Sequence, residues 1–340
     1  MKQAIIGAAA GLATAGILLA FGPLPLNLSS ESTGSETISA TLTDEAAKGH
    51  HDLTAFIYDN GEVTFGGLGA DEHTEVEIGS LTKTFNAELV RQLVEEKQLT
   101  VETTVGELYE VNDTPIADVT IGELLNHTAG LDTIESITTV ELLTARVRDG
   151  GNPYRRDTPQ QILDSAKDAT LKGRGEYNYS NYSQALLGQL LALHTGSSYE
   201  AMLRTRIFEP AGMSETYLAA PGTVDDAPRG RRTDGRAAKP WDMDGWAPAG
   251  AIRSTATDMA KYVAWVADHG RPDDGWLERE IDGTEYPYHN GGTGGFSTVI
   301  VWDPADPKRA AFVAGNTPLG VEVIGAALLR TPGTGKENKP

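Results

Sequence analysis

Three short stretches of this 340-residue chain carry side chains that could break an ester or amide bond. The first is Ser80 with Lys83 three residues later, a spacing that returns both side chains to one face of a helix. A serine hydroxyl is a weak nucleophile until a base takes its proton, and a desolvated lysine amine can be that base. A capping serine followed by a surface lysine is the plain alternative, because Ser-x-x-Lys also occurs by chance.

The second stretch holds Tyr179 and Asn181, just before an apolar segment that favours a helix. A tyrosine hydroxyl beside a lysine amine can exist partly as phenolate and relay protons. The Asn181 amide can donate to a substrate carbonyl and accept from Lys83. The same Tyr-x-Asn pattern at Tyr58 lies in a predicted turn, which favours a structural role there.

The third stretch is the glycine-rich run from His289 to Phe296. Four glycines within five positions, between two strand-like segments, indicate a close backbone approach or conformations closed to other residues. A plain glycine-rich hairpin is the alternative. The histidine at its start tips the interpretation toward function, and we predict four substrate-binding residues here: His289, Asn290, Gly291 and Gly292.

These stretches need elements that bring them together. Apolar residues follow Ser80 at i, i+4 spacing and predict a helix that packs on a core: Leu81, Phe85, Leu89 and Leu93. Free backbone N–H groups at the start of such a helix favour a developing oxyanion near Ser80. The run 53–68, with Asn60-Gly61 at its centre, favours a β-hairpin.

Predicted strands lie at both ends of the chain, with a long helical block between them. Strands that are distant in sequence would then pair in one sheet. We therefore predict an α+β fold in which an antiparallel sheet is flanked by helices and carries an inserted all-helical lobe. The predicted boundaries are a domain at 49–330, with an α/β lobe at about 49–105 and 245–330 and a helical lobe at about 106–244.

Charge and composition exclude several classes of function. The net charge of −20 argues against nucleic acid or an anionic membrane surface as a partner. The chain has no cysteine, so it cannot form a disulfide or a cysteine metal site. Its seven histidines lack His-Glu-x-x-His spacing, and no metal or other cofactor is expected.

The two ends of the chain differ from the rest in composition. Lys2 precedes an uncharged apolar run, so residues 1–28 are predicted to be a signal peptide or an uncleaved N-terminal membrane anchor. Either one places the rest of the chain outside the cytoplasm, secreted or membrane-anchored. Residues 29–48, rich in Ser, Thr and Glu over 29–43, favour a tether that runs into a short helix, and 331–340 favour a disordered tail.

As an ordered set, Ser80-x-x-Lys83, Tyr179-x-Asn181 and His289-x-Gly291 resemble the motifs of the serine β-lactamase-like family. This family includes class C β-lactamases, DD-carboxypeptidases and related esterases and D-aminopeptidases. Supporting segments resemble family signatures at 78–85, 124–131, 207–213 and 248–255. The resemblance covers about 52–329. It implies that Ser80 is acylated, Lys83 accepts its proton, Tyr179 helps to deprotonate the serine and later the water, and Asn181 binds the substrate carbonyl.

The third motif departs from the family pattern. The β-lactamases carry Lys-Thr-Gly where this chain has His289-Asn290-Gly291, and histidine is mostly neutral at pH 7. We therefore expect a preference for uncharged esters or amides over carboxylate-bearing β-lactams. The pocket walls are expected to include Tyr154, Trp246 and the loop before His289.

The predicted function is an exported serine hydrolase that cleaves an ester or amide bond through a covalent acyl-serine. Its substrate would be a small molecule or a cell-wall peptide. The alternative is a non-catalytic, penicillin-binding-type surface protein of the same fold. An α/β-hydrolase is excluded because the chain has no Gly-x-Ser-x-Gly elbow.

Overall fold

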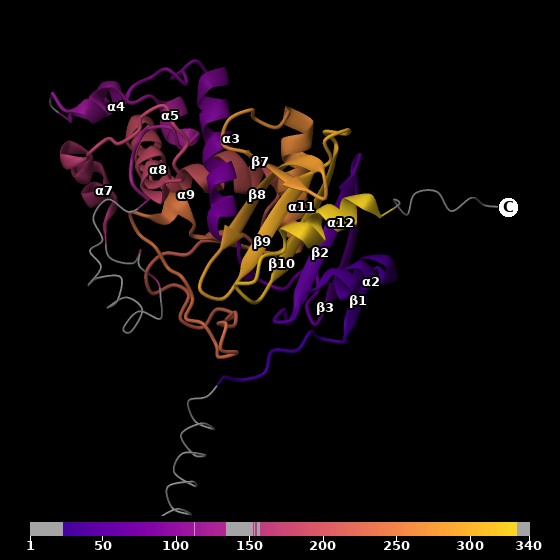
Figure 1. Cartoon of the computed structure of the whole chain (residues 1–340). Helices are drawn as coiled ribbons and strands as arrows, with labels where there is room; N and C mark the ends of the chain where they lie inside the picture. The colour runs from indigo at the N-terminus through magenta and orange to yellow at the C-terminus, as the bar shows by residue number, and fades with distance from the viewer. Residues whose placement is uncertain (1–22, 112, 134–151, 153, 155–156, 332–340) are drawn as a thin grey trace, which may run out of the picture.

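The computed structural model describes residues 23–111, 113–133, 152, 154 and 157–331. Within these ranges, one antiparallel sheet has the strand order β1-β3-β2-β10-β9-β8-β7 (Figure 1). The strands are β1 (Ser32–Gly34), β2 (Leu53–Asp59), β3 (Glu62–Leu68), β7 (Leu277–Ile281), β8 (Thr284–Gly292), β9 (Ser297–Trp302) and β10 (Arg309–Gly315). Because β2 pairs with β10, the sheet joins segments from the two ends of the chain. The antiparallel sheet predicted from the sequence is confirmed.

The β2–β3 hairpin forms at the predicted Asn60-Gly61 turn. Asp59 pairs with Glu62, which leaves two residues in the turn. Both have positive φ, 50° at Asn60 and 95° at Gly61, as the tight turn that matches the strand twist requires. The turn chemistry therefore sets the register of the two strands.

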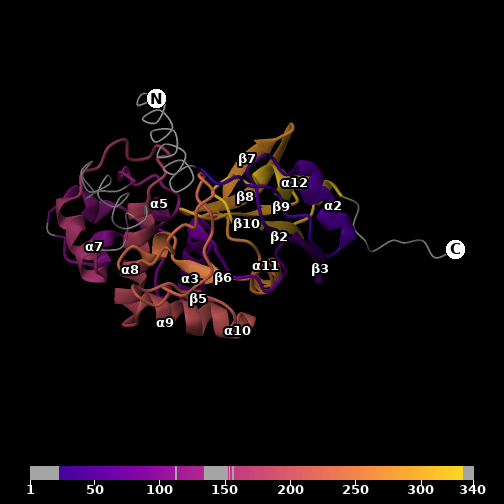
Figure 2. The same cartoon turned by 90° about the horizontal axis from the view of Figure 1, so that it is seen from below.

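Side chains alternate between two hydrophobic layers on the two faces of the sheet. On one face, Phe56 of β2 stacks on Phe312 of β10 with ring centroids 5.3 Å apart, and α11 (Ala256–His269) covers them. On the other face, α2 (Glu36–Glu45) and α12 (Glu322–Arg330) pack on Ile57 and Val313 (Figure 2). Since successive residues of a strand point to opposite faces, both layers are built from the same strands.

The segment predicted as a tether that runs into a short helix does contain a helix, α2, but β1 and α2 are packed parts of the fold. β1 pairs with β3, and Ser35 caps α2 by accepting from the Ile38 N–H. Ile38 and Leu42, one helical turn apart, are both buried against the sheet and α12. These two apolar residues lie among Ser, Thr and Glu, so the composition of the segment did not reveal that it packs on the sheet.

The helical part lies beside the sheet, as Figure 1 shows at the left. Its helices are α3 (Thr82–Glu95), α4 (Val105–Leu108), α5 (Ile121–Leu125), α7 (Pro159–Ser165), α8 (Asn181–Thr195), α9 (Tyr199–Leu203) and α10 (Glu209–Ala211). The lobe predicted to be all-helical at 106–244 contains a short strand toward its C-terminal end. There β5 (Tyr217–Leu218) and β4 (Val76–Glu77) pair with β6 (Ile252–Ser254) in a small second sheet. Strands this short carry no periodic pattern that a sequence could show.

The signal peptide or anchor predicted for 1–28 lies mostly outside the described residues, as does the tail predicted for 331–340. Near the start of the described residues, the Leu24 N–H donates to the Asp234 carbonyl at 2.8 Å. Across the residues that are described, no helix is long and apolar enough to cross a membrane.

Candidate active site

Ser80 lies in a single 3₁₀ turn (Gly79–Leu81) that leads directly into α3, between the sheet and the helical part. Gly79 has a φ of 53°, and a Cβ there would lie 2.7 Å from the backbone nitrogen of Gly292. Thr298 of β9 donates to the Ile78 carbonyl at 2.8 Å. The turn that carries the serine is therefore fixed against the end of β8, and glycine is required for that close approach.

Two side chains converge on the Ser80 hydroxyl. Lys83 Nζ lies 2.8 Å from Ser80 Oγ, and the Tyr179 hydroxyl donates to the same oxygen at 2.7 Å. Lys83 also donates to the Ala249 carbonyl at 2.6 Å, which aims its amine at the serine. The structure thus brings together the three residues that the sequence assigned to catalysis, from segments about 100 residues apart.

Lys83 is buried, with 1% of its surface exposed. Burial lowers the pKa of the Lys83 amine well below its ordinary value, because the charged form loses its hydration. A neutral amine has a free lone pair. At the distance observed, that lone pair can accept the serine proton.

Tyr179 behaves differently from the sequence-based expectation of a partial phenolate. Burial raises the pKa of the Tyr179 hydroxyl far above its ordinary value, and the nearby hydroxyls of Tyr154, Tyr177 and Tyr288 raise it further. The hydrogen bond from Tyr179 to Ser80 lowers the pKa, but by less than burial raises it. The resting hydroxyl is therefore protonated and positioned as a proton donor.

His127, at the end of the family-like segment's helix, packs directly on Tyr179. Their ring centroids are 4.6 Å apart. The His127 Nδ1 accepts from the Ser180 N–H at 3.1 Å, and its carbonyl accepts from the Asn178 N–H at 2.8 Å. His127 has a φ of 59°, an uncommon backbone conformation for a histidine. It thus fixes the segment that carries Tyr179, and its place in the family-like segment 124–131 was the available signal.

The third motif differs from the prediction at two of its four residues. His289 is buried with 1% exposure, and its Nδ1–H donates to the Asn290 carbonyl at 2.8 Å. Burial first, and the nearby Lys83 amine second, lower the pKa of His289 to about 3. Asn290 donates to Glu322 of α12 at 2.6 Å, on the opposite face of the sheet, because alternate strand residues point to opposite faces. The side chains of His289 and Asn290 thus make contacts within the protein, and the structure does not support direct substrate binding by them.

Gly291 of that motif makes the close approach that its type suggested, and Gly292 faces the open space in front of Ser80. A Cβ at Gly291 would lie 1.9 Å from the Ile78 carbonyl oxygen. Gly292 lines a cavity of about 80 Å³ together with Ser80. The end of β8 therefore forms one wall of the space in front of the nucleophile.

Asn181 lines the same small cavity from the first residue of α8. Ser180 caps that helix by accepting from the Ser183 N–H at 3.0 Å, which fixes the position of Asn181. The Asn181 amide donates to the Tyr154 hydroxyl at 2.9 Å. Trp241 and Met243 complete the wall beside Tyr154. The side chains that line this cavity are thus uncharged.

Of the predicted wall residues, Tyr154 lines the small cavity, whereas Trp246 lies behind it. Trp246 is fully buried, and its ring centroid is 5.3 Å from that of Tyr154. The wall residue that sequence reasoning missed is Trp241. The backbone N–H of Trp241 donates to the Glu77 carboxylate at 2.7 Å, and that carboxylate also accepts from the buried Arg253 guanidinium at 2.8 Å. This ion pair anchors the loop that carries Trp241.

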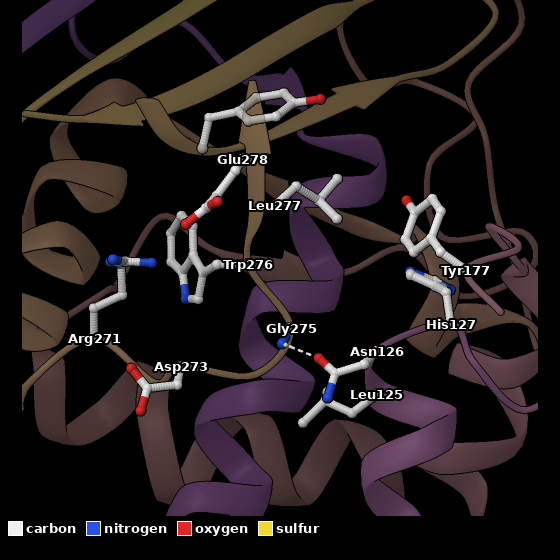
Figure 3. Close-up of a pocket in the computed structure, with 11 residues that line it drawn as sticks. Leu125, Asn126, His127, Tyr177, Arg271, Asp273, Gly275, Trp276, Leu277 and Glu278 are labelled. Carbon is white, nitrogen blue, oxygen red and sulfur yellow. Dashed lines mark hydrogen bonds between the residues drawn. The ribbon is translucent and has the colours of Figure 1, made fainter. Parts of the chain in front are cut away.

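A larger cavity of about 600 Å³ opens on the other side of His127 (Figure 3). Its lining comes from α5, from the segment before Tyr179, from the loop between α11 and β7, and from β7 and β8. It includes Asn126, His127, Tyr177, Arg271, Trp276 and Tyr288. The loop before His289 thus contributes to this cavity and not to the small one.

Comparisons with known proteins relate most of the chain to one family. The family model described as Beta-lactamase matches residues 43–331. Penicillin-binding protein 4 of Amycolatopsis lactamdurans is 28% identical over 243 residues, which cover 66% of this chain and 58% of that protein. The chain therefore spans less than two thirds of the length of that relative.

Solved structures show the same fold. A class C beta lactamase from Rhodobacter sphaeroides superposes with a TM-score of 0.71 at 17% identity, covering 87% of this chain and 99% of that one. A D-amino acid amidase from Ochrobactrum anthropi superposes with a TM-score of 0.68 at 21% identity, covering 86% and 96%.

Proposed function

This chain belongs to the beta-lactamase family, whose members are serine hydrolases, and from that premise we propose that it cleaves an ester or amide bond through an acyl-Ser80 intermediate. The observation that carries the proposal is the convergence of Lys83 Nζ and the Tyr179 hydroxyl on Ser80 Oγ, at 2.8 and 2.7 Å. A capping serine would need neither contact.

The proton path follows from the protonation states. Ser80 Oγ forms a bond to the substrate carbonyl carbon while its proton passes to neutral Lys83. When the carbonyl re-forms, the bond to the leaving oxygen or nitrogen breaks, and that atom takes the Tyr179 proton. The Lys83 ammonium then returns a proton to Tyr179. Water repeats the sequence in the second half and releases the acid.

The developing oxyanion needs donors that are fixed before the reaction. We place it between the backbone N–H groups of Ser80 and Gly292, which line the same small cavity. Each such donor is worth about 3–4 kcal/mol in the transition state of comparable enzymes. The packing of Gly79 against Gly292 holds the two backbones together.

The small cavity supports a small or apolar acyl group. Its volume is about 80 Å³, and Tyr154, Trp241 and Met243 line it. A carboxylate placed there would lose its hydration without a cationic partner, since Lys83 is neutral. Uncharged esters and amides are therefore the substrate class that the site supports beside the scissile bond.

Covalent labelling tests the proposal. A fluorophosphonate or penicillin probe should add one adduct to the purified protein, seen by intact mass, and Ser80→Ala should remove it. Ser197→Ala, at an exposed serine, is the matched control and should label like wild type. Labelling of Ser80→Ala would disprove the assignment. A wild-type penicilloyl adduct that never turns over, together with no hydrolysis of an activated ester, would favour the non-catalytic, penicillin-binding alternative.

We also propose that the protein acts outside the cytoplasm. The support is the sequence of residues 1–28, with Lys2 before an uncharged apolar run. Fractionation of cells that express the full chain tests this, and recovery of all protein in the cytoplasmic fraction would contradict it. The mass of the exported protein would show whether the segment is cleaved.

A further inference from the structure

We propose that the cavity of about 600 Å³ holds the leaving group of the substrate, and that Arg271 on its far wall binds a carboxylate at the distal end of that group. The inference rests on the proposed hydrolase function and specifies its substrate. It concerns a part of the substrate remote from the scissile bond.

The position of the proton donor, the Tyr179 hydroxyl, indicates on which side of Ser80 the leaving group lies. The atom that leaves must face the Tyr179 hydroxyl, which supplies its proton. His127, stacked on Tyr179, is a wall of the large cavity. Tyr177 and Tyr288, whose hydroxyls lie close enough to raise the pKa of Tyr179, are two further walls. Asn181 and Gly292 line the small cavity instead, which leaves that cavity for the acyl group.

The basic side chains near Ser80, Lys83 and His289, cannot bind a substrate anion. Lys83 is buried and neutral, and His289 is buried with a pKa lowered to about 3. Asn290 points to the other face of the sheet. An anion beside the scissile bond would therefore have no cationic partner among these residues.

Arg271 is the cationic side chain in the lining of the large cavity. Its guanidinium lies 5.8 Å from the centroid of the Trp276 ring. Figure 3 shows it across the cavity from His127 and Tyr177. Among the residues that the structure describes, no carboxylate lies within ion-pair distance of it and no hydrogen-bond acceptor contacts it. A partly buried guanidinium without a partner gains most from a carboxylate, which matches its fork of N–H donors.

The acidic neighbours of Arg271 restrict where an anion can sit. Asp273 and Glu278 also line the cavity and act on the guanidinium through space, raising its pKa against the larger effect of burial. Both are exposed. They would repel a carboxylate anywhere except in direct contact with the Arg271 fork. The predicted leaving group therefore has an aromatic or apolar middle along Trp276 and Tyr288 and an anionic end.

The test uses two phenyl acetates that differ only at the end of a chain para to the ester, one a carboxylate and one the neutral carboxamide. The measured quantity is the ratio of their kcat/KM values. Arg271→Gln should lower this ratio at least tenfold, about 1.4 kcal/mol, mainly through KM of the carboxylate ester. Arg271→Lys should restore part of it, because lysine keeps the charge and loses the fork.

Arg279→Gln is the matched control. It removes the same charge from an exposed side chain of β7 that lies 3.7 Å from Glu322, outside the cavity lining. An unchanged ratio in Arg271→Gln, or an equal loss in Arg279→Gln, would overturn the inference. If the carboxamide ester is hydrolysed equally by wild type and all three variants, the hydrolase proposal survives that result. If wild type hydrolyses neither ester and Ser80 takes no label, both fail.

Discussion

Gly291 and Ile78 touch backbone to backbone: a Cβ at Gly291 would lie 1.9 Å from the Ile78 carbonyl oxygen. Ile78 comes two residues before Ser80, and Gly291 comes one residue before Gly292. The distance between the two proposed oxyanion donors therefore depends on a contact that only glycine permits.

Gly291→Ala should separate β8 from the serine turn. We expect kcat/KM to fall at least 10²-fold, the scale of one lost oxyanion donor, with a lower melting temperature. Gly292→Ala is the structural control, because a Cβ there meets no atom within 4 Å, and its melting temperature should equal that of wild type. Calorimetry and ester kinetics measure both effects. A fully active Gly291→Ala would contradict the close-contact account.

Tyr179→Phe should cut turnover by about 10²–10⁴, because it removes the group that protonates the leaving atom. The Ser80 adduct should still form with an activated probe whose leaving group needs no proton. Tyr58→Phe is the control for the other Tyr-x-Asn match, which lies in β2 at the hairpin turn. Equal losses in the two variants, measured as kcat on one ester, would show that Tyr179 has no special role.

Two of the buried histidines, His127 and His289, should make the protein sensitive to acid. The pKa of His127 and that of His289 are both lowered to about 3, by burial first. In the unfolded chain these side chains bind protons near pH 6.5. Their contribution to stability is therefore complete above about pH 6.5 and is lost as the pH falls toward 3.

His289→Gln should remove one of these two contributions. The slope of unfolding free energy against pH, between pH 6 and 4, should decrease by up to about 1.4 kcal/mol per pH unit. Urea melts at several pH values provide the slope. His194→Gln, at an exposed histidine, is the control. Identical slopes in wild type and His289→Gln would show that His289 is not buried in its neutral form.

Glu77→Ala should destabilise the fold and the acyl side of the site together. It leaves the buried Arg253 guanidinium without one of its carboxylates and frees the Trp241 N–H. Losing one partner of a buried ion pair costs about 3–5 kcal/mol, and Glu75 and the Pro228 carbonyl, which still contact Arg253, favour the lower end. Chemical denaturation measures the loss, with exposed Glu62→Ala as control. A loss below about 1 kcal/mol would contradict this role.

The sequence revealed the residues of the site best where their chemistry is local. Ser80 and Lys83 share a helix face because of their spacing alone, and the Tyr179 segment precedes a clear apolar helix. Asn290 was assigned wrongly because the register of β8 against β9, which the glycine-rich pattern alone does not reveal, decides which face of the sheet a side chain meets.

Other features could not be read from local patterns. Ile38 and Leu42 became core residues through contacts with the sheet and with α12, which are distant in the sequence. The large cavity beside Arg271 is lined by segments that are far apart in the sequence, from α5 to β8. In each case, tertiary contacts determined what propensity and composition could not.

The pairing of β10 between β2 and β9 also sets when the protein can begin to work. β2 leaves the ribosome early, whereas its partner β10 begins at Arg309, and the two pair from Asp59 with Arg309 to Leu53 with Gly315. Such distant pairing is slow to form, because the long loop must close before the contacts can stabilise it. In a nascent chain, Ser80 therefore leaves the ribosome before the sheet that positions it can form. Translation itself delays the chemistry until β10 has been made.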